Sequence, residues 1–180
     1  HICGFSIQNF MKLKKNLIFL GMMGSGKSSI GLLVSRKLKL NFIDIDKEIE
    51  REMGTKITKI FENKGEKFFR ELEEKVSLKM IKKSRTVVAL GGGAFLNKNI
   101  RKEVLNNHIS FWLNWDSKTL IDRIKNSAKR PIAIKSSNYE LNEMIKKRSN
   151  FYSKAMYKIN CEGISKNEIL NKVLEICETY

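Results

Sequence analysis

One eight-residue segment, residues 21–28, constrains the fold of this chain more than any other part of it. It reads G-M-M-G-S-G-K-S and matches the pattern G-x-x-x-x-G-K-[ST]. An apolar run precedes it and apolar residues at helical spacing follow it, which predicts a strand, a loop and a helix in succession. In such a unit the glycines let successive backbone N–H groups curl around a phosphate at the positive end of the helix. The pattern also predicts that Lys27 reaches the β- and γ-phosphates of a nucleotide and that the Ser28 hydroxyl holds Mg²⁺.

The rest of the chain repeats this alternation of short apolar runs and longer helical segments. We expect five strands, at residues 17–20, 41–46, 86–90, 109–113 and 157–161. We expect a helical region after the second strand that is broken near Gly54 and Gly65, with a last part over residues 66–83. We also expect helices around residues 30–38, 100–105, 116–125 and 141–155, and a last helix that starts at the capping box Ser165-x-x-Glu168. Strands separated by helices predict an α/β domain with a mostly parallel sheet.

Neither internal repeats nor a linker divide the chain, so we interpret residues 11–180 as a single domain. Residues 1–10, ahead of Met11, lack the features of a secretory signal, and we interpret them as an N-terminal extension. Residues 126–139 have no clear period and contain Pro131, the only proline, which predicts a long mobile loop. No apolar run approaches the roughly 20 residues that a membrane-spanning helix needs, so we expect no membrane partner.

The charge balance of the chain allows two interpretations. There are 35 lysines and arginines against 19 acidic residues, a net charge of +16. Such a protein can bind nucleic acid, or its surplus can be a solvated face around a pocket for anionic small molecules. The basic residues are spread along the chain and form no dense block, so charge alone does not decide between the two.

Cysteines and histidines are few. The three cysteines have no C-x-x-C spacing, so we expect neither a disulfide framework nor a zinc site, and a reduced cytoplasmic setting fits better. Apart from His1, a Ser-His or Cys-His pair would have to use His108, which we expect to begin a buried strand.

Polar residues and glycines follow two more of the predicted strands. Asp44 and Asp46 end the second strand, where alternation would point both carboxylates to one side, one toward a metal and one toward a substrate hydroxyl. Helix capping by Asp46 is the competing interpretation. Gly91, Gly92 and Gly93 follow the third strand and would let a ligand touch the backbone, although a tight turn also uses glycine. In parallel sheets ligands bind beyond the carboxyl ends of the strands, so these residues and the 21–28 loop predict one site.

Three arginines are candidates for binding a carboxylate or a phosphate. Arg70, Arg130 and Arg148 could present planar guanidinium forks to such a group. In so basic a chain each of them could equally be a solvated surface residue.

Together these residues resemble the shikimate kinases, a family of P-loop small-molecule kinases. The resemblance runs through GMMGSGKSS, the D-x-D of Asp44 and Asp46, and ITKIFENKGEKFFRELE at residues 57–73. It continues through GGGA at 91–94, Arg130-Pro131, and KRSNFY at 147–152. The segment G-E-x-x-F-R-x-x-E, which starts at Gly65, and the triple glycine discriminate best, since the P-loop alone identifies only a binder of nucleotide phosphates.

The resemblance implies the fold, the reaction and the site. It implies a P-loop kinase three-layer sandwich, with a five-stranded parallel sheet, helices on both faces and a mobile lid at about residues 126–139. The implied reaction transfers the ATP γ-phosphate to the 3-hydroxyl of shikimate, a step toward chorismate and the aromatic amino acids. The implied ATP-binding residues are Gly24, Ser25, Gly26, Lys27, Ser28, Ser29, Arg123 and Arg130. The implied shikimate-binding residues are Asp46, Arg70, Gly91, Gly92, Gly93 and Arg148, with Phe61 and Phe69 as pocket walls. Ser28 and Asp44 would serve Mg²⁺, and Lys27, Asp46 and Arg130 would be catalytic.

Two rival functions remain at this stage. One is another P-loop kinase of similar size, such as a gluconate kinase or a nucleoside monophosphate kinase. The other is a basic nucleic-acid-binding protein, against which the intact Lys27, Ser28 and Asp44 argue, as does the lack of an aromatic-rich basic strand. We therefore expect a cytoplasmic, monomeric kinase that uses ATP and Mg²⁺ and binds no specific nucleic acid.

Overall fold

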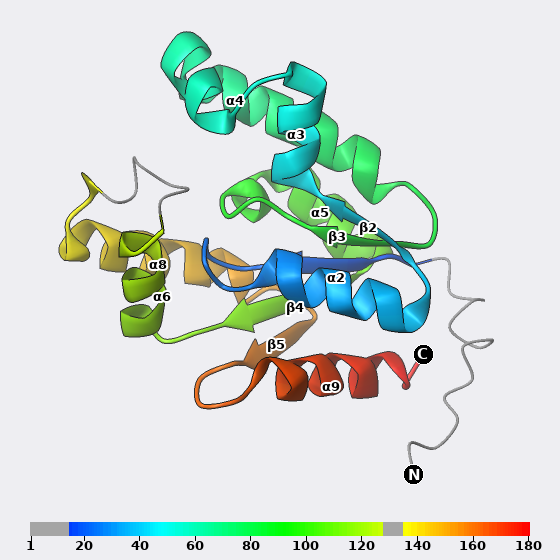
Figure 1. Ribbon diagram of the computed structural model, residues 1–180. Coiled ribbons are helices and arrows are strands. Elements are labelled where there is room, and N and C mark those ends of the chain that lie inside the picture. The colour runs from blue at the N-terminus through cyan, green and yellow to red at the C-terminus, as the bar shows by residue number, and fades with distance from the viewer. Residues whose placement is uncertain (1–14, 128–134) are drawn as a thin grey trace.

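The computed structural model of the protein describes residues 15–127 and 135–180. The predicted N-terminal extension and half of the predicted lid (residues 128–134, including Arg130) lie outside these residues. Within them the chain forms a central parallel sheet with helices on both faces (Figure 1), which confirms the predicted α/β fold class.

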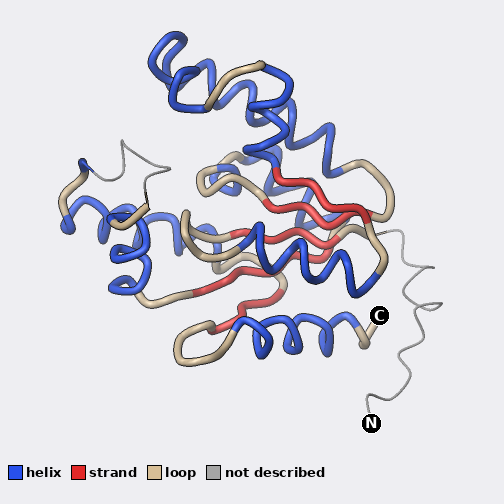
Figure 2. Tube along the Cα trace, in the orientation of Figure 1, coloured by secondary structure: helices blue, strands red, loops and turns tan. Residues whose placement is uncertain are grey.

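The sheet has five strands in the order β2-β3-β1-β4-β5, and every neighbouring pair is parallel (Figure 2). The strands are β1 (Leu17–Leu20), β2 (Asn41–Asp44), β3 (Thr86–Ala89), β4 (Ile109–Asn114) and β5 (Tyr157–Asn160). Because β1 lies between β3 and β4, the strand that leads into the 21–28 loop runs through the centre of the sheet. The carboxyl ends of β2, β3 and β1 are therefore neighbours, so the three predicted site segments come together at one edge.

Helices cover the sheet on both sides. In chain order they are α2 (Lys27–Leu38), α3 (Ile45–Met53), α4 (Ile57–Ile81), the short 3₁₀ helix η1 (Ala94–Leu96), α5 (Lys98–Asn107), α6 (Ser117–Lys125), α8 (Asn138–Tyr152) and α9 (Lys166–Cys177). None of the helices in the described part of the chain is long and apolar enough to cross a membrane.

The alternation of β1 divides the core into two clusters. Leu17 and Phe19 pack in the cluster that includes residues of α2 and α9, whereas Ile18 and Leu20 pack in the one that includes residues of α4, α5 and α8. All four side chains are at most 1% exposed. Burying each stabilises the fold by about 1.5–3 kcal/mol, so a strand this short is held by burial on both faces.

The structure corrects the predicted end of the second strand. The strand ends at Asp44, and α3 begins at Ile45, so Asp46 lies in the first turn of a helix. The cause is helix capping by the other aspartate: Asp44 Oδ1 accepts a hydrogen bond of 3.2 Å from the backbone N–H of Lys47. The strand alternation that we used to aim both carboxylates is therefore wrong at Asp46.

The other helix boundaries agree more closely with the sequence. Gly54 (φ 63°) caps α3 and Gly65 (φ 80°, ψ 172°) interrupts α4, at the two predicted breaks. The capping box of Ser165 and Glu168 starts α9 as predicted. A second box, formed by Ser137 and Glu140, starts α8 inside the segment that we expected to be loop.

Candidate active site

The loop after β1 has the backbone conformation that its glycines predict. Gly21, Gly24 and Gly26 have φ angles of 141°, 79° and 89°. Gly26 is the N-cap of α2, whose first turn has no acidic residue and no side-chain cap. The first N–H groups of α2 therefore face the loop without an anionic side chain to accept from them, as a phosphate-binding helix start requires.

Lys27 lies back across this loop. Its side chain is 8% exposed, and Nζ donates hydrogen bonds to the carbonyl oxygens of Gly21 (2.9 Å) and Met22 (2.8 Å). The Lys27 ammonium group therefore lies inside the loop, bonded to its backbone carbonyl oxygens. A flexible four-carbon stem lets that ammonium move onto a phosphate at the same place.

Ser28 and Asp44 form the candidate metal site. Ser28 Oγ donates a hydrogen bond to Asp44 Oδ2, although the two residues come from different elements. A hydroxyl and a carboxylate are the hard oxygen ligands that Mg²⁺ takes, usually one or two from the protein with water and phosphate oxygens completing the octahedron. The pair therefore fits the predicted ion.

Asp46 lies beside a second carboxylate that the sequence analysis did not single out. A methyl group at Gly91 would lie 2.8 Å from Asp46 Oδ1 and 2.6 Å from Glu73 Oε1, so both carboxylates cover this glycine. Glu73 is 3% exposed. Burial raises the pKa of Glu73, the Arg70 guanidinium opposes that rise, and the Asp46 carboxylate adds to it.

Two arginines reach the glycine turn from different helices. Arg70, on α4, donates from Nη1 to Glu73 Oε2 (2.6 Å), and its Nη1 lies 2.5 Å from where a methyl group on Gly93 would be. Arg148, on α8, has its Nη1 3.3 Å from the equivalent position on Gly92. Both guanidinium groups therefore occupy the space left by the missing side chains, where we expected a ligand to touch the backbone.

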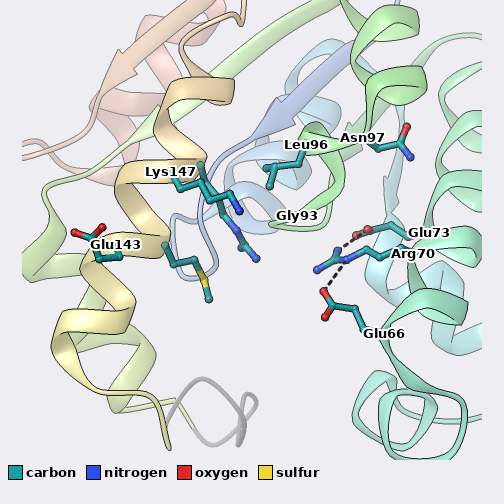
Figure 3. A pocket seen from close by; sticks show the side chains of 10 residues that line it. Glu66, Arg70, Glu73, Gly93, Leu96, Asn97, Glu143 and Lys147 are labelled. Atoms are coloured by element: carbon teal, nitrogen blue, oxygen red, sulfur yellow. Dashed lines mark hydrogen bonds and ion pairs between the residues drawn. The ribbon is translucent and has the colours of Figure 1, made fainter.

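A cavity of about 630 Å³ opens between these two helices. Figure 3 shows the side chains of Arg70, Glu73 and Glu66 on α4, opposite those of Lys147 and Glu143 on α8. The other lining residues are Gly93, Leu96, Asn97, Met144 and Arg148. Two guanidinium groups and one lysine on the walls suit a small molecule that carries a carboxylate.

Phe61 and Phe69, which we expected to be pocket walls, are not among the residues that line this cavity but lie next to Arg70. The rings of Phe61 and Phe69 have centroids 4.5 Å apart, and the Arg70 guanidinium lies 5.3 Å over the Phe69 ring. Phe69 is 4% exposed. The ring pair, which belongs to α4 like Arg70 itself, therefore packs against the Arg70 guanidinium through Phe69.

Tyr152 and Met22 connect the glycine turn to the phosphate loop. The Tyr152 hydroxyl donates to the carbonyl oxygen of Gly92, and burial raises the pKa of Tyr152 to about 12. Arg148 Nη1 and the Tyr152 hydroxyl lie 4.0 and 3.8 Å from the Met22 sulfur. The sequence analysis missed Tyr152, and its place in KRSNFY, four residues after Arg148 on the same helix, is the only signal that could have indicated it.

A second, smaller cavity of about 230 Å³ lies on the other side of the loop. Arg123 lines it, with Nη1 donating to the Gly24 carbonyl oxygen at 3.1 Å and the guanidinium 3.9 Å over the Trp115 ring. Ser25, Gly26 and Ser29 also line it, which places four predicted ATP-binding residues around one space. Of the other four, Gly24, Lys27 and Ser28 belong to the loop and the start of α2, and Arg130 lies outside the described residues.

Comparison with known proteins identifies relatives of this architecture. The sequence profile described as "Shikimate kinase" matches residues 23–178. A shikimate kinase from Persephonella marina is 37% identical over 160 residues, which cover 89% of this chain and 97% of the relative.

Solved structures agree with the sequence relatives. The shikimate kinase from Acinetobacter baumannii, solved in complex with shikimate, superposes with a TM-score of 0.89 at 28% identity, covering 96% of this chain and 97% of that one. The shikimate kinase from Aquifex aeolicus gives 0.80 at 31% identity, covering 89% and 94%. A gluconokinase from Sinorhizobium meliloti gives 0.62 at 13% identity, a likeness of fold alone.

Proposed function

The chain belongs to the shikimate kinase family, and we propose that its two cavities divide the substrates of that reaction between them. It is an ATP-dependent kinase that transfers the γ-phosphate to the 3-hydroxyl of shikimate, giving shikimate 3-phosphate and ADP on the route to chorismate and the aromatic amino acids. ATP binds across the loop and the cavity of Arg123. Shikimate binds in the cavity between α4 and α8.

One observation carries this division: the Arg148 guanidinium and the phosphate loop approach the glycine turn at the same residue. A methyl group on Gly92 would lie 3.3 Å from Arg148 Nη1 and 3.4 Å from the backbone nitrogen of Met23. A molecule held by Arg148 is therefore within a few ångströms of a phosphate held by the loop. Phosphoryl transfer depends mainly on such positioning and on charge neutralisation.

The nucleotide is held by the loop and by α2. The backbone N–H groups of Gly24 and Gly26 face the phosphates, Ser25 lies between them with its own N–H on the Met22 carbonyl oxygen, and Ser29 lies at the start of the helix. Lys27 leaves the carbonyl oxygens that it contacts and binds the β- and γ-phosphates. Arg123 stacks on the adenine, and Arg130 reaches the phosphates from the lid.

Mg²⁺ would bind to Ser28 Oγ and, through water, to Asp44. When bound, the ion neutralises charge on the β- and γ-phosphates. The existing Ser28–Asp44 hydrogen bond holds these two oxygens together before the ion arrives.

Shikimate is oriented by its carboxylate. Arg70 and Arg148 grip that group, Gly91, Gly92 and Gly93 give it room at the backbone, and Phe61 and Phe69 support the wall behind Arg70. The 3-hydroxyl then lies against Asp46, which accepts its hydrogen bond and is placed to take its proton. The hydroxyl oxygen bonds to the γ-phosphorus as the bond to the bridging oxygen of ADP breaks.

The cellular setting follows from the family and from the cysteines. Cys161 and Cys177 are buried free thiols, which fits a reducing compartment. We therefore place the enzyme in the cytoplasm, as a monomer with no specific nucleic-acid partner, its surplus positive charge being a solvated face.

An acceptor screen tests the proposal. ADP formation is followed with ATP and Mg²⁺ over shikimate, gluconate and nucleoside monophosphates, and the phosphorylated product is identified by mass spectrometry. We expect turnover with shikimate alone, lost when Mg²⁺ is chelated and restored when it is added back. Equal ADP formation with and without shikimate, and no response to the other acceptors, would refute the kinase assignment.

A further inference from the structure

Trp115 bonds to the phosphate loop from a distant part of the chain. It lies between β4 and α6, next to Asp116, whose side chain caps α6 by accepting from the Thr119 N–H at 2.9 Å. Its indole Nε1 donates a hydrogen bond of 2.9 Å to the carbonyl oxygen of Ser25. Trp115 is partly buried and packs against both hydrophobic clusters, so the core on both faces of the sheet fixes its position.

Arg123 and Trp115 together form what we call the brace: their side chains bind the carbonyl oxygens of two consecutive loop residues, Gly24 and Ser25. The Arg123 guanidinium lies 3.9 Å over the indole ring, within the range of a cation–π interaction. Its Nη1 donates to the carbonyl oxygen of Gly24, next to the one that Trp115 holds. Each member of the pair therefore orders the other as well as the loop.

Because the peptide unit is planar, hydrogen bonds to these two carbonyl oxygens also fix the direction of the N–H groups that follow them. In a trans peptide the C=O of one residue and the N–H of the next point in opposite directions. A Ser25 carbonyl tied to Trp115 therefore aims the Gly26 N–H the other way. A Gly24 carbonyl tied to Arg123 likewise sets the direction of the Ser25 N–H, which donates to the Met22 carbonyl oxygen at 3.2 Å and so closes the turn before Gly26. The Gly26 N–H is one of the groups that the proposed function assigns to the phosphates.

Trp115 also sets the geometry of the base-binding part of the cavity. It and Arg123 line the cavity of about 230 Å³, with Lys166 and Ile169 of α9 among the other lining residues. A guanidinium has two faces, and Trp115 covers one of them at 3.9 Å. The other face is left for a flat ring, which would make a three-layer stack of indole, guanidinium and base.

We propose that Trp115 is a positioning residue for the nucleotide, which orients the phosphate-binding N–H of Gly26 through the Ser25 carbonyl and prepares Arg123 for stacking on the base. The proposal rests on the proposed ATP site. It assigns to Trp115 no contact with shikimate and no part in the chemical step.

Two variants at Trp115 separate its two actions. Trp115→Phe keeps a ring under Arg123 and removes the N–H donor, whereas Trp115→Leu removes both. Loss of one net hydrogen bond corresponds to about five-fold in affinity. Loss of an exposed cation–π contact corresponds to about two- to five-fold more. Tyr157→Phe is the matched control, because it also removes one hydrogen-bonding group from a partly buried aromatic side chain. The group removed there is the Tyr157 hydroxyl, which lies 2.7 Å from the Tyr180 hydroxyl.

Binding and kinetics are measured together. Dissociation constants are determined by calorimetric titration in the absence of shikimate for ADP, which carries a base, and for inorganic tripolyphosphate, which does not. Trp115→Phe should weaken both about five-fold, and Trp115→Leu should weaken ADP further than tripolyphosphate. The KM for ATP should rise in parallel, with kcat and the shikimate KM within about two-fold of wild type. Tyr157→Phe should change none of these.

Two outcomes would overturn the proposal. One is an unchanged ADP affinity in a folded Trp115→Phe or Trp115→Leu protein, and the other is a loss confined to kcat or to the shikimate KM. If these variants do not fold, Trp112→Phe provides a second test, because the chain has two tryptophans and Trp115 is then the only one left. ADP should then change its emission, and an unchanged spectrum at saturating ADP would equally refute the proposal. Because ADP binding is read without shikimate, a failure here is distinct from a failure of the kinase assignment.

Discussion

Gly93→Ala tests the contribution of Arg70 to shikimate binding without substituting Arg70 itself. Gly93 has φ −98° and ψ −8°, a conformation that alanine adopts, so the substitution introduces no backbone strain. The added methyl group would lie 2.5, 2.9 and 3.0 Å from three atoms of the Arg70 guanidinium. Because that side chain is 37% exposed, it can move aside, and we expect the fold to survive.

The expected loss follows from what Arg70 must leave. Displacement breaks its 2.6 Å bond to Glu73 and moves the guanidinium away from the proposed carboxylate position. One charge-assisted contact contributes about 1.5–3 kcal/mol. The shikimate KM should therefore rise between about ten-fold and about a hundred-fold, with the ATP KM unchanged. Since the carboxylate does not change during transfer, most of the loss should appear in KM, with a smaller effect on kcat.

A double-mutant cycle tests the reasoning. Steady-state kinetics are measured for Gly93→Ala, Arg70→Ala and the double variant, and melting temperatures check folding. If the methyl group acts through Arg70, adding Gly93→Ala to Arg70→Ala should have almost no further effect. Additive losses, or an unchanged shikimate KM in Gly93→Ala, would show that the methyl group does not act through Arg70.

Three further predictions concern single residues. Lys27→Ala should lower kcat by about a hundred-fold or more while leaving the melting temperature and the circular dichroism spectrum unchanged. Arg148→Ala should raise the shikimate KM about ten-fold or more, whereas Arg130→Ala should lower kcat and leave that KM nearly unchanged, which steady-state kinetics distinguishes. Burial lowers the pKa of His108 from its ordinary 6.5, against the opposing effect of Glu103. The unfolded chain therefore takes up this proton first, so stability should fall as the pH drops below about 6.5, and melting temperatures of His108→Gln should lack this part of the pH dependence.

Local patterns in the sequence were enough to predict the phosphate loop. Its eight residues are contiguous, and glycines at 21, 24 and 26 supply the positive φ angles that the curve needs. The strand before it and the helix after it follow from hydrophobic period, because burial on both faces leaves β1 wholly apolar. The capping box at Ser165 was predictable for the same reason, since a cap involves residues three apart.

The sequence was less reliable where two local patterns competed. The segment Asp44-Ile45-Asp46 fits a strand by alternation and a helix start by capping. Asp44 accepts the Lys47 N–H, so the cap lies two residues earlier than Asp46, the candidate from the sequence, and Asp46 lies in a helix beside Glu73. Both interpretations were open from the residues, and only the folded backbone distinguished them.

The sequence by itself determined the class of fold and the conformation of the phosphate loop, because each of these depends on neighbours within a few positions. The tertiary structure alone decided the partners: Glu73 beside Asp46, Tyr152 on Gly92, and Trp115 on Ser25, a contact across 90 positions. These contacts exist because β1 lies between β3 and β4, which brings the ends of strands far apart in the chain to one edge of the sheet. Strand order depends on how the whole chain packs, and no short pattern of residues encodes it.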